Sequence, residues 1–266
     1  MLRIEKLTKV YPDGTRALHE IDLTVPDGQF VVIIGLSGSG KSTLMRCINR
    51  LVMPTGGKIW LDGADIAAAS PTQMRHIRRN IGMIFQHFNL VNRSSVLTNV
   101  LSGRLGYAAT VPTLFHHFSR EDMARAYHNL ERVGILEKAY NRADTLSGGQ
   151  RQRVGIARAL MQEPKLMLAD EPVASLDPAT SHSVMKYLEQ INKEDGITVL
   201  CNLHFLSLAR RYADRVIALK AGEIVFDGPA QEINDARFKA IYGEDAAEVE
   251  IGPERQAAAL TAGEVR

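Results

Sequence analysis

One nine-residue stretch constrains this chain more than any other: residues 35–43, which read GLSGSGKST. It follows a continuous apolar run, Phe30 to Ile34, and precedes residues 44–51, which we predict to form a helix. A buried strand, a glycine loop and a helix in this order form a phosphate cradle, because the glycines let backbone N–H groups turn inward and the helix N-terminus adds its positive dipole end. Lys41 would reach the outer phosphates, and the Ser42 hydroxyl would hold Mg²⁺. The alternative is a glycine turn without a ligand, but such a turn has no use for Lys41 and Ser42 at these places.

The composition sets broader bounds. The chain has 266 residues, enough for one large domain or two small ones, and it is 45% apolar and 23% charged, as in ordinary globular proteins. Its net charge of +2 is too small to argue for a nucleic-acid partner. The two cysteines, Cys47 and Cys201, are expected to be small buried residues of a reducing compartment. No stretch approaches the length of a membrane span, and the N-terminus alternates like a strand rather than a signal peptide, so we expect a soluble intracellular protein whose membrane role, if any, comes through a partner.

A second glycine-bearing loop stands before another predicted helix. Residues 146–150 read LSGGQ, and the helix is expected from Arg151 to Met161. A glycine loop at a helix N-terminus is a second candidate anion site. The residues alone do not reject the alternative, a simple N-terminal cap by Ser147.

Three predicted strands end in polar residues, which is where open α/β sheets place their ligand contacts. A buried strand over residues 165–169 delivers Asp170 and Glu171, a pair suited to a Mg²⁺ ion and a base, although the two could instead cap a following turn. The apolar strand from Ile197 ends at His204, which its position makes a site candidate. Gln86 ends the strand over 81–85 and is weak evidence by itself.

The remaining segments predict the surroundings of this core. Strands over residues 2–7, 18–25 and 58–62 indicate an antiparallel layer, and Tyr11 stands just before the turn between the first two. Helices are expected after Ser70, from Ser119 to Val133 and after Asp177, and strands at 215–219 and 223–226. The helix after Ser70 carries Arg75, His76, Arg78 and Arg79, which we read as a solvated face rather than a partner surface. Residues 87–118 lack a clear period, and the adjacent His116 and His117 make a poor metal site. Residues 244–266 form a tail that we expect to be loosely attached.

With these motifs in order, the chain resembles the ATPase subunits of ABC transporters over roughly residues 1–230. The resemblance implies an α/β P-loop NTPase fold of ABC-ATPase type, with an antiparallel β layer and an inserted helical subdomain over about 87–160 within a domain spanning 1–243. It implies ATP and Mg²⁺ as cofactors.

The resemblance also assigns roles to residues. Tyr11 would stack on adenine, and the phosphate loop (Walker A) would bind nucleotide through Gly35, Ser37, Gly38, Ser39, Gly40, Lys41, Ser42 and Thr43. The signature residues Ser147, Gly148, Gly149 and Gln150 and the D-loop residue Asp177 would bind it from the other side. Catalysis would use Glu171 as base, His204 as the contact to the γ-phosphate and Gln86 as the sensor of the metal site. Ser42, Gln86 and Asp170 would hold the metal.

In this family, ATP is clamped between the phosphate loop of one subunit and the signature of another, so one copy of each motif suffices in a head-to-tail homodimer. Closure would exclude water and leave catalysis to positioning and charge. The further partners implied are integral membrane permease subunits and, indirectly, a periplasmic or extracellular solute-binding protein. The implied location is the cytoplasmic face of the cell membrane. Residues 87–91 and the surroundings of Arg104 are expected to face the membrane subunit.

Three phrases look like the phosphonate-importer branch: residues 99–106, residues 169–178, and a set that runs from 202–204 through 213–215 to 226–229. The leading hypothesis is therefore the ATPase of a phosphonate importer. The alternatives are a soluble ATPase of a phosphonate-degrading complex, an importer ATPase for another small polar solute, and an ABC ATPase of DNA repair or translation, whose second cassette or long insertions are not visible here. A small-molecule kinase would share the phosphate loop but would not need LSGGQ.

Overall fold

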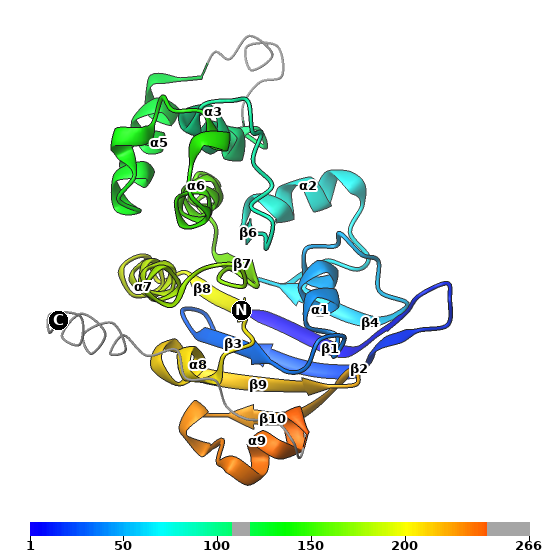
Figure 1. Ribbon diagram of the computed structural model, residues 1–266. Helices are drawn as coiled ribbons and strands as arrows, with labels where there is room; N and C mark the ends of the chain where they lie inside the picture. Colours follow the sequence, from blue (N-terminus) through cyan, green and yellow to red (C-terminus); the bar gives the residue numbers. More distant parts are fainter. Residues whose placement is uncertain (108–117, 244–266) are drawn as a thin grey trace, which may run out of the picture.

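The computed structural model describes residues 1–107 and 118–243 of the chain. The histidine pair at 116–117 and the tail at 244–266 lie outside the described residues. Two β-sheets and the helices around them make up the described part (Figure 1). The α/β class and the antiparallel layer expected from the sequence are confirmed.

The first sheet is the antiparallel layer. It contains β1 (Leu2–Val10), β2 (Arg16–Val25), β4 (Gly56–Leu61) and β5 (Ala64–Asp65), in the order β2-β1-β4-β5. Leu2, Ile4 and Leu7 of β1 are buried, because one face of this sheet packs on the interior while the other faces solvent.

The second sheet has six strands in the order β10-β9-β3-β8-β7-β6. Its strands are β3 (Phe30–Ile34), β6 (Ile81–Ile84), β7 (Leu166–Asp170), β8 (Thr198–Asn202), β9 (Arg215–Lys220) and β10 (Glu223–Gly228). All neighbouring strands are parallel except the edge pair β9 and β10. The carboxyl ends of β3, β7 and β8 therefore meet at one edge of the sheet.

The six-stranded sheet separates two hydrophobic cores. Phe30, Val32 and Ile34 of β3 belong to one core, while Val31 and Ile33 belong to the other. This division follows from the two-residue period of a strand, and it explains why the buried strands read as continuous apolar runs. One core lies against the antiparallel sheet and α1 (Lys41–Ile48), and the other lies against helices on the opposite face.

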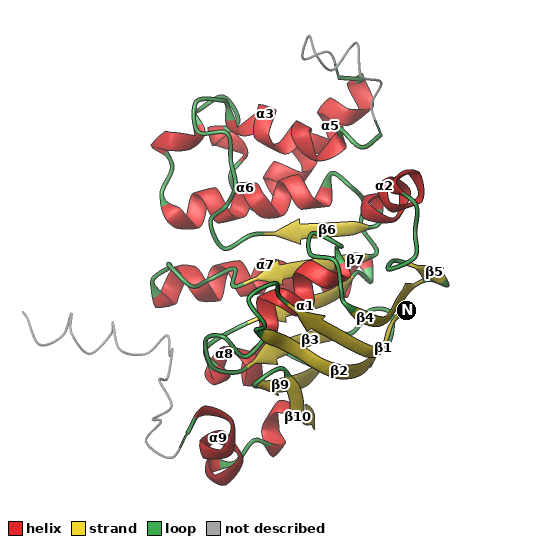
Figure 2. Cartoon of the chain, turned by 90° about the vertical axis from the view of Figure 1, so that its right-hand side faces the viewer, coloured by secondary structure: helices red, strands yellow, loops and turns green. Residues whose placement is uncertain are grey.

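The helices form two groups. Helices α3 (Val96–Leu101), α5 (Arg120–Arg132) and α6 (Gly148–Leu160) pack on one another beyond the β6 edge of the sheet, while α7 (Pro178–Asp195) and α8 (Leu206–Tyr212) cover one of its faces (Figures 1 and 2). The others are α2 (Pro71–Arg79) and α9 (Asp235–Tyr242). Helix α3 falls in a segment whose sequence shows no clear period. Its six residues are nearly all buried, so it lacks the exposed polar face that makes a period visible. No helix in the ranges 1–107 and 118–243 is both long and apolar enough to span a membrane.

Candidate nucleotide site

The phosphate loop depends on glycines at two tightly packed positions. Gly35 and Gly40 have φ angles of 145° and 104°, and a β-carbon on either would lie 2.2 Å from the Leu219 carbonyl oxygen or 2.5 Å from that of Ala17, respectively. Side chains cannot be accommodated at such distances, so the loop must be backbone alone at these points. Gly38, with φ 78°, has open space around it.

Lys41 begins α1 and lies over its own loop. Its Nζ donates to the carbonyl oxygens of Gly35 at 2.7 Å and Leu36 at 2.9 Å, and its side chain is buried. Burial lowers the pKa of Lys41, and the nearby carboxylates of Glu171 and Asp170 act in the opposite direction. A cation that is partly desolvated beside a glycine loop is well placed to meet the charge of a phosphate.

Asp170, at the end of β7, is the centre of a polar cluster. Its Oδ1 accepts from the Ser42 hydroxyl at 2.8 Å and from the Asn202 amide at 2.8 Å, and its Oδ2 lies 3.8 Å from the Arg46 guanidinium. Sequence reasoning missed Asn202. Its place becomes apparent only from the strand register of the structure, in which Asn202 ends β8 directly opposite Asp170.

Glu171 and His204 form an ion-pair geometry next to this cluster. His204 Nε2 lies 2.7 Å from Glu171 Oε1, although the two residues follow different strands. Glu171 has a φ of 51°, an uncommon angle for a residue with a side chain, and such angles recur at functional sites. The predicted base and the predicted γ-phosphate contact thus lie side by side.

A cavity of about 150 Å³ joins the loop to Glu171. Its walls are formed by Ala17, Ser37, Gly38, Gly40, Lys41, Ser42, Thr43 and Glu171. Tyr11 lies at its side, with its hydroxyl 3.3 Å from Thr43 Oγ1 and the Lys9 amine 5.1 Å from its ring centre. The structure therefore brings Tyr11, the phosphate loop, Asp170, Glu171 and His204 together.

The oxygen donors near the loop fit a Mg²⁺ ion in type. Ser42 Oγ and the Asp170 carboxylate are hard oxygen ligands 2.8 Å apart, and Asn202 Oδ1 is buried without a partner. Gln86, half-buried two residues beyond β6, is a third candidate. Within the described ranges, no group of three or more His, Cys, Asp or Glu residues could hold a metal ion by itself. Proteins usually bind Mg²⁺ through one or two carboxylates, and water molecules and substrate phosphates supply the other ligands.

The signature stands at the start of α6. Ser147 caps the helix in a capping box with Gln150, so the cap interpretation is correct and the helix begins at Gly148, three residues earlier than predicted. A β-carbon on Gly149 would lie 2.2 Å from the Thr180 side chain of α7, whose own cap is Asp177. Across residues 1–107 and 118–243, no hydrogen bond or ion pair joins 147–150 or Asp177 to the phosphate loop. The structure does not bring the two anion sites of one chain together.

Fold and site together define a P-loop protein with a nucleotide site at the carboxyl edge of its parallel strands. The sequence pattern of the family described as "ABC transporter" matches residues 18–174, more than half of the chain, so the chain belongs to that family.

Proteins with similar sequences match this chain along nearly its whole length. A protein of Bdellovibrio bacteriovorus named "Phosphonates import ATP-binding protein PhnC" is 58% identical over 250 residues, which cover 94% of this chain and 96% of that one. A protein of Halalkalibacterium halodurans with the name "Phosphonates import ATP-binding protein PhnC 3" is 56% identical over 243 residues, 91% of this chain and 94% of that one.

Solved structures share the fold. A dimeric ATP-binding cassette in a post-hydrolysis state, bound to ADP and Pi, is 35% identical with a TM-score of 0.75, and the match covers 88% of this chain and all of that one. The cbiO1 protein of Clostridium perfringens, part of an ABC transporter complex, is 31% identical with a TM-score of 0.78 over 90% of this chain and 92% of that one.

Proposed function

We propose that this chain hydrolyses ATP and thereby powers a membrane importer for phosphonates. The observation that most directly supports ATP hydrolysis is the Glu171–His204 pair beside the phosphate-loop cavity. The names of the relatives, at 55–58% identity, support the substrate class. No side chain of this site selects a phosphonate, so the choice of solute would rest with partner proteins.

Catalysis would follow from position and charge. Glu171 would orient a water molecule or take its proton, and His204 would hold Glu171 in place and contact the γ-phosphate. Lys41 and the loop amides would bind the phosphates, with Tyr11 against the adenine. Ser42, Asp170 and Gln86 would hold a Mg²⁺ ion, which when bound neutralises phosphate charge.

A second copy would complete the site. The N-terminus of α6, with Ser147, Gly148, Gly149 and Gln150, offers backbone N–H groups but makes no polar contact with its own phosphate loop in the described residues. In a head-to-tail pair, this helix end and Asp177 of one copy would close over the nucleotide of the other. The dimeric state of a similar cassette supports this arrangement.

The permease would dock near the group formed by α3, α5 and α6. A groove of about 480 Å³ lies between α2 and β6 on one side and α6 and residues 102–107 on the other. Four arginines line it: Arg75, Arg78, Arg79 and Arg158. We infer that the basic face of α2 contacts this partner, although the sequence pattern favours a solvated face. The expected contact at 87–91 and around Arg104 lies beside the groove.

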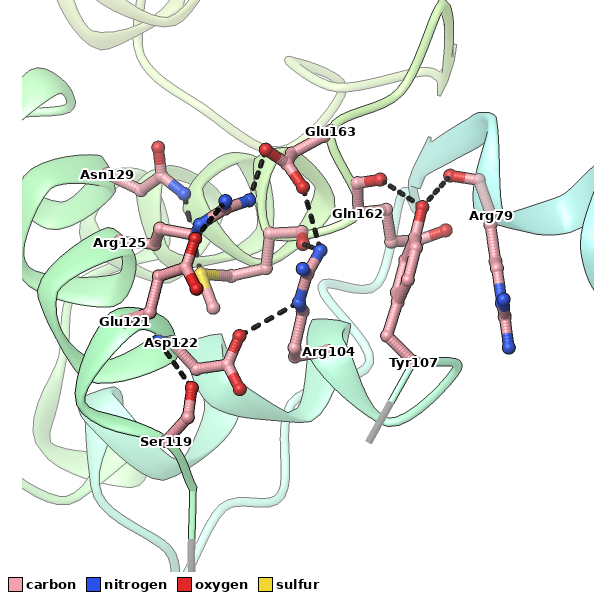
Figure 3. A network of polar contacts seen from close by, with 11 residues as sticks. Arg79, Arg104, Tyr107, Ser119, Glu121, Asp122, Arg125, Asn129, Gln162 and Glu163 are labelled. Atoms are coloured by element: carbon pink, nitrogen blue, oxygen red, sulfur yellow. Dashed lines mark hydrogen bonds and ion pairs between the residues drawn. The ribbon is translucent and has the colours of Figure 1, made fainter. Parts of the chain in front are cut away.

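Arg104 itself has little freedom to bind a partner. Its guanidinium donates to Asp122 at 2.9 Å and Glu163 at 2.9 Å and lies 4.1 Å from the centre of the Tyr107 ring (Figure 3). We therefore assign partner contact in this region to its exposed neighbours Leu105 and Tyr107. The ion pairs of Arg104 would keep their surroundings rigid.

The remaining assignments follow from this function. Residues 1–243 would form the ATPase domain, with a helical subdomain over about 87–160, and 244–266 a tail. The chain would lie at the cytoplasmic face of the cell membrane, with a solute-binding protein as an indirect partner and no nucleic acid.

Co-purification tests the proposal. The tagged chain would be isolated from its native cells in mild detergent, and its partners identified. We expect a multi-span membrane protein, and ATPase activity of the complex that rises with a phosphonate-loaded binding protein. Soluble partners alone would favour the phosphonate-degrading complex, and stimulation by a different solute would replace phosphonates as the substrate class.

A further inference from the structure

The segment that follows β6 contains a strained turn directly after Gln86. Phe88 and Asn89 have φ angles of 59° and 48°, and the Asn89 N–H donates to the His87 carbonyl oxygen at 2.5 Å. A hydrogen bond between residues i and i+2 around a left-handed central residue is a rare and strained form of γ-turn. Two consecutive side-chain-bearing residues in this region persist only where the surrounding structure holds them.

Arg158 of α6 holds this turn. Its guanidinium donates to the carbonyl oxygens of Phe88 at 2.8 Å and Asn89 at 2.5 Å, the two residues with positive φ. Bonds from a charged donor are stronger than neutral ones, and the planar guanidinium can reach two acceptors at once. Burial lowers the pKa of Arg158, in keeping with a desolvated contact.

The backbone that carries Arg158 is itself fixed. A β-carbon on Gly103 would lie 2.1 Å from the Arg158 carbonyl oxygen, so the turn after α3 packs directly on α6 at this residue. The far end of the loop is also anchored to the helical group, because Asn99 of α3 accepts from the Val91 N–H at 2.7 Å and donates to its carbonyl oxygen at 3.2 Å. Residues 88–91 are thus attached by hydrogen bonds to α3 and α6, while Gln86 follows β6 of the six-stranded sheet.

The turn also touches the start of α6. A β-carbon on Gly148 would lie 3.9 Å from the Phe88 ring and 3.2 Å from the Leu176 side chain. Arg158 and Gly148 stand at opposite ends of the same helix, and both adjoin Phe88. The position of this turn is therefore tied to the helix that carries the signature.

We propose that Arg158 is a positioning residue that latches the Phe88–Asn89 turn to α6, so that Gln86 and the signature helix take up their places together. The inference rests on the proposed function, because it gives the latch a role in ATP hydrolysis. Arg158 touches neither the phosphate loop nor Glu171. Its loss should therefore spare nucleotide binding and impair the hydrolysis step.

Two variants and one control test the latch in the full-length chain. Arg158→Met keeps the apolar stem and removes the donors, and Arg158→Lys restores part of them. Arg153→Met is the matched control, because Arg153 lies on the same helix and donates to the Gly134 carbonyl oxygen, far along the chain from the turn. Amide hydrogen exchange of residues 87–92 and steady-state ATPase kinetics with Mg-ATP are measured for each.

For Arg158→Met we expect exchange in residues 87–92 to quicken about tenfold and kcat to fall about tenfold, with KM for ATP within about twofold of wild type. Arg158→Lys should lie between, and Arg153→Met should match wild type in both measurements. Unchanged exchange in the turn, or an equal loss in the Arg153 control, would overturn the latch. A wild-type chain without ATPase activity would instead refute the proposed function, and the exchange data would still decide whether Arg158 holds the turn.

Discussion

His204 Nε2 lies 2.7 Å from Glu171 Oε1, and the contact joins the residues that follow β8 and β7. Those two strands are neighbours in the sheet, with Asp170 opposite Asn202 at their ends. The sheet therefore sets the separation of the two side chains, and we expect them to act as a unit.

The first prediction concerns this coupling. Glu171→Gln should lower kcat for ATP hydrolysis by about 10²–10⁴, the usual contribution of a positioned base. His204→Ala should lower it less, because the base remains. The double variant should be no slower than Glu171→Gln alone, since groups that work together are not additive. Single-turnover hydrolysis of radiolabelled ATP measures all three, and losses that multiply would show that the two residues act independently.

The second prediction separates two glycines of one loop. In Gly40→Ala, a residue with a positive φ gains a β-carbon 2.5 Å from the Ala17 carbonyl oxygen. Gly38 also has a positive φ, but a β-carbon there would have open space around it. We expect Gly38→Ala to cost about 1–2 kcal/mol of unfolding free energy, and Gly40→Ala to cost at least about 2 kcal/mol more. Urea unfolding without nucleotide measures both. Equal losses would mean that the close approach at Gly40 is relieved by a small shift.

Much of the site could be predicted from sequence because its determinants are local. The residues of the phosphate loop, the strand that ends at Asp170, and the caps Ser147 and Asp177 each carry their signal within a few neighbouring residues. Asn202 and Arg158 could not be found in this way. Their roles arise from contacts to Asp170 and to the Phe88–Asn89 turn, 32 and about 70 residues away along the chain.

The elements without a prediction have the same explanation. Among these helices, α3 is nearly all buried, and α8 and α9 have only seven and eight residues, so none shows an amphipathic period long enough to recognise. Tertiary packing specifies them, and a single sequence does not display it.

The third prediction uses a buried thiol. Burial raises the pKa of Cys47 from 9.0 to about 11, so the folded chain holds the thiol proton more tightly than the unfolded chain. The resulting stability is complete below pH 9 and is lost as the pH rises from 9 to 11. Between pH 8 and 10, the wild type should lose about 1 kcal/mol more unfolding free energy than Cys47→Ala. Urea unfolding at the two pH values measures the difference, and parallel losses would place Cys47 in contact with water.

The most direct test of the whole account is the mass in solution of the Glu171→Gln variant, measured by light scattering with and without Mg-ATP. The account predicts the mass of one chain without nucleotide and twice that mass at saturating Mg-ATP, because binding is retained while hydrolysis is blocked and the signature of each copy closes over the nucleotide of the other. A second substitution, Lys41→Ala, should abolish the dimer by removing a phosphate contact. If the Glu171→Gln variant stays monomeric at saturating Mg-ATP, the shared nucleotide site is wrong.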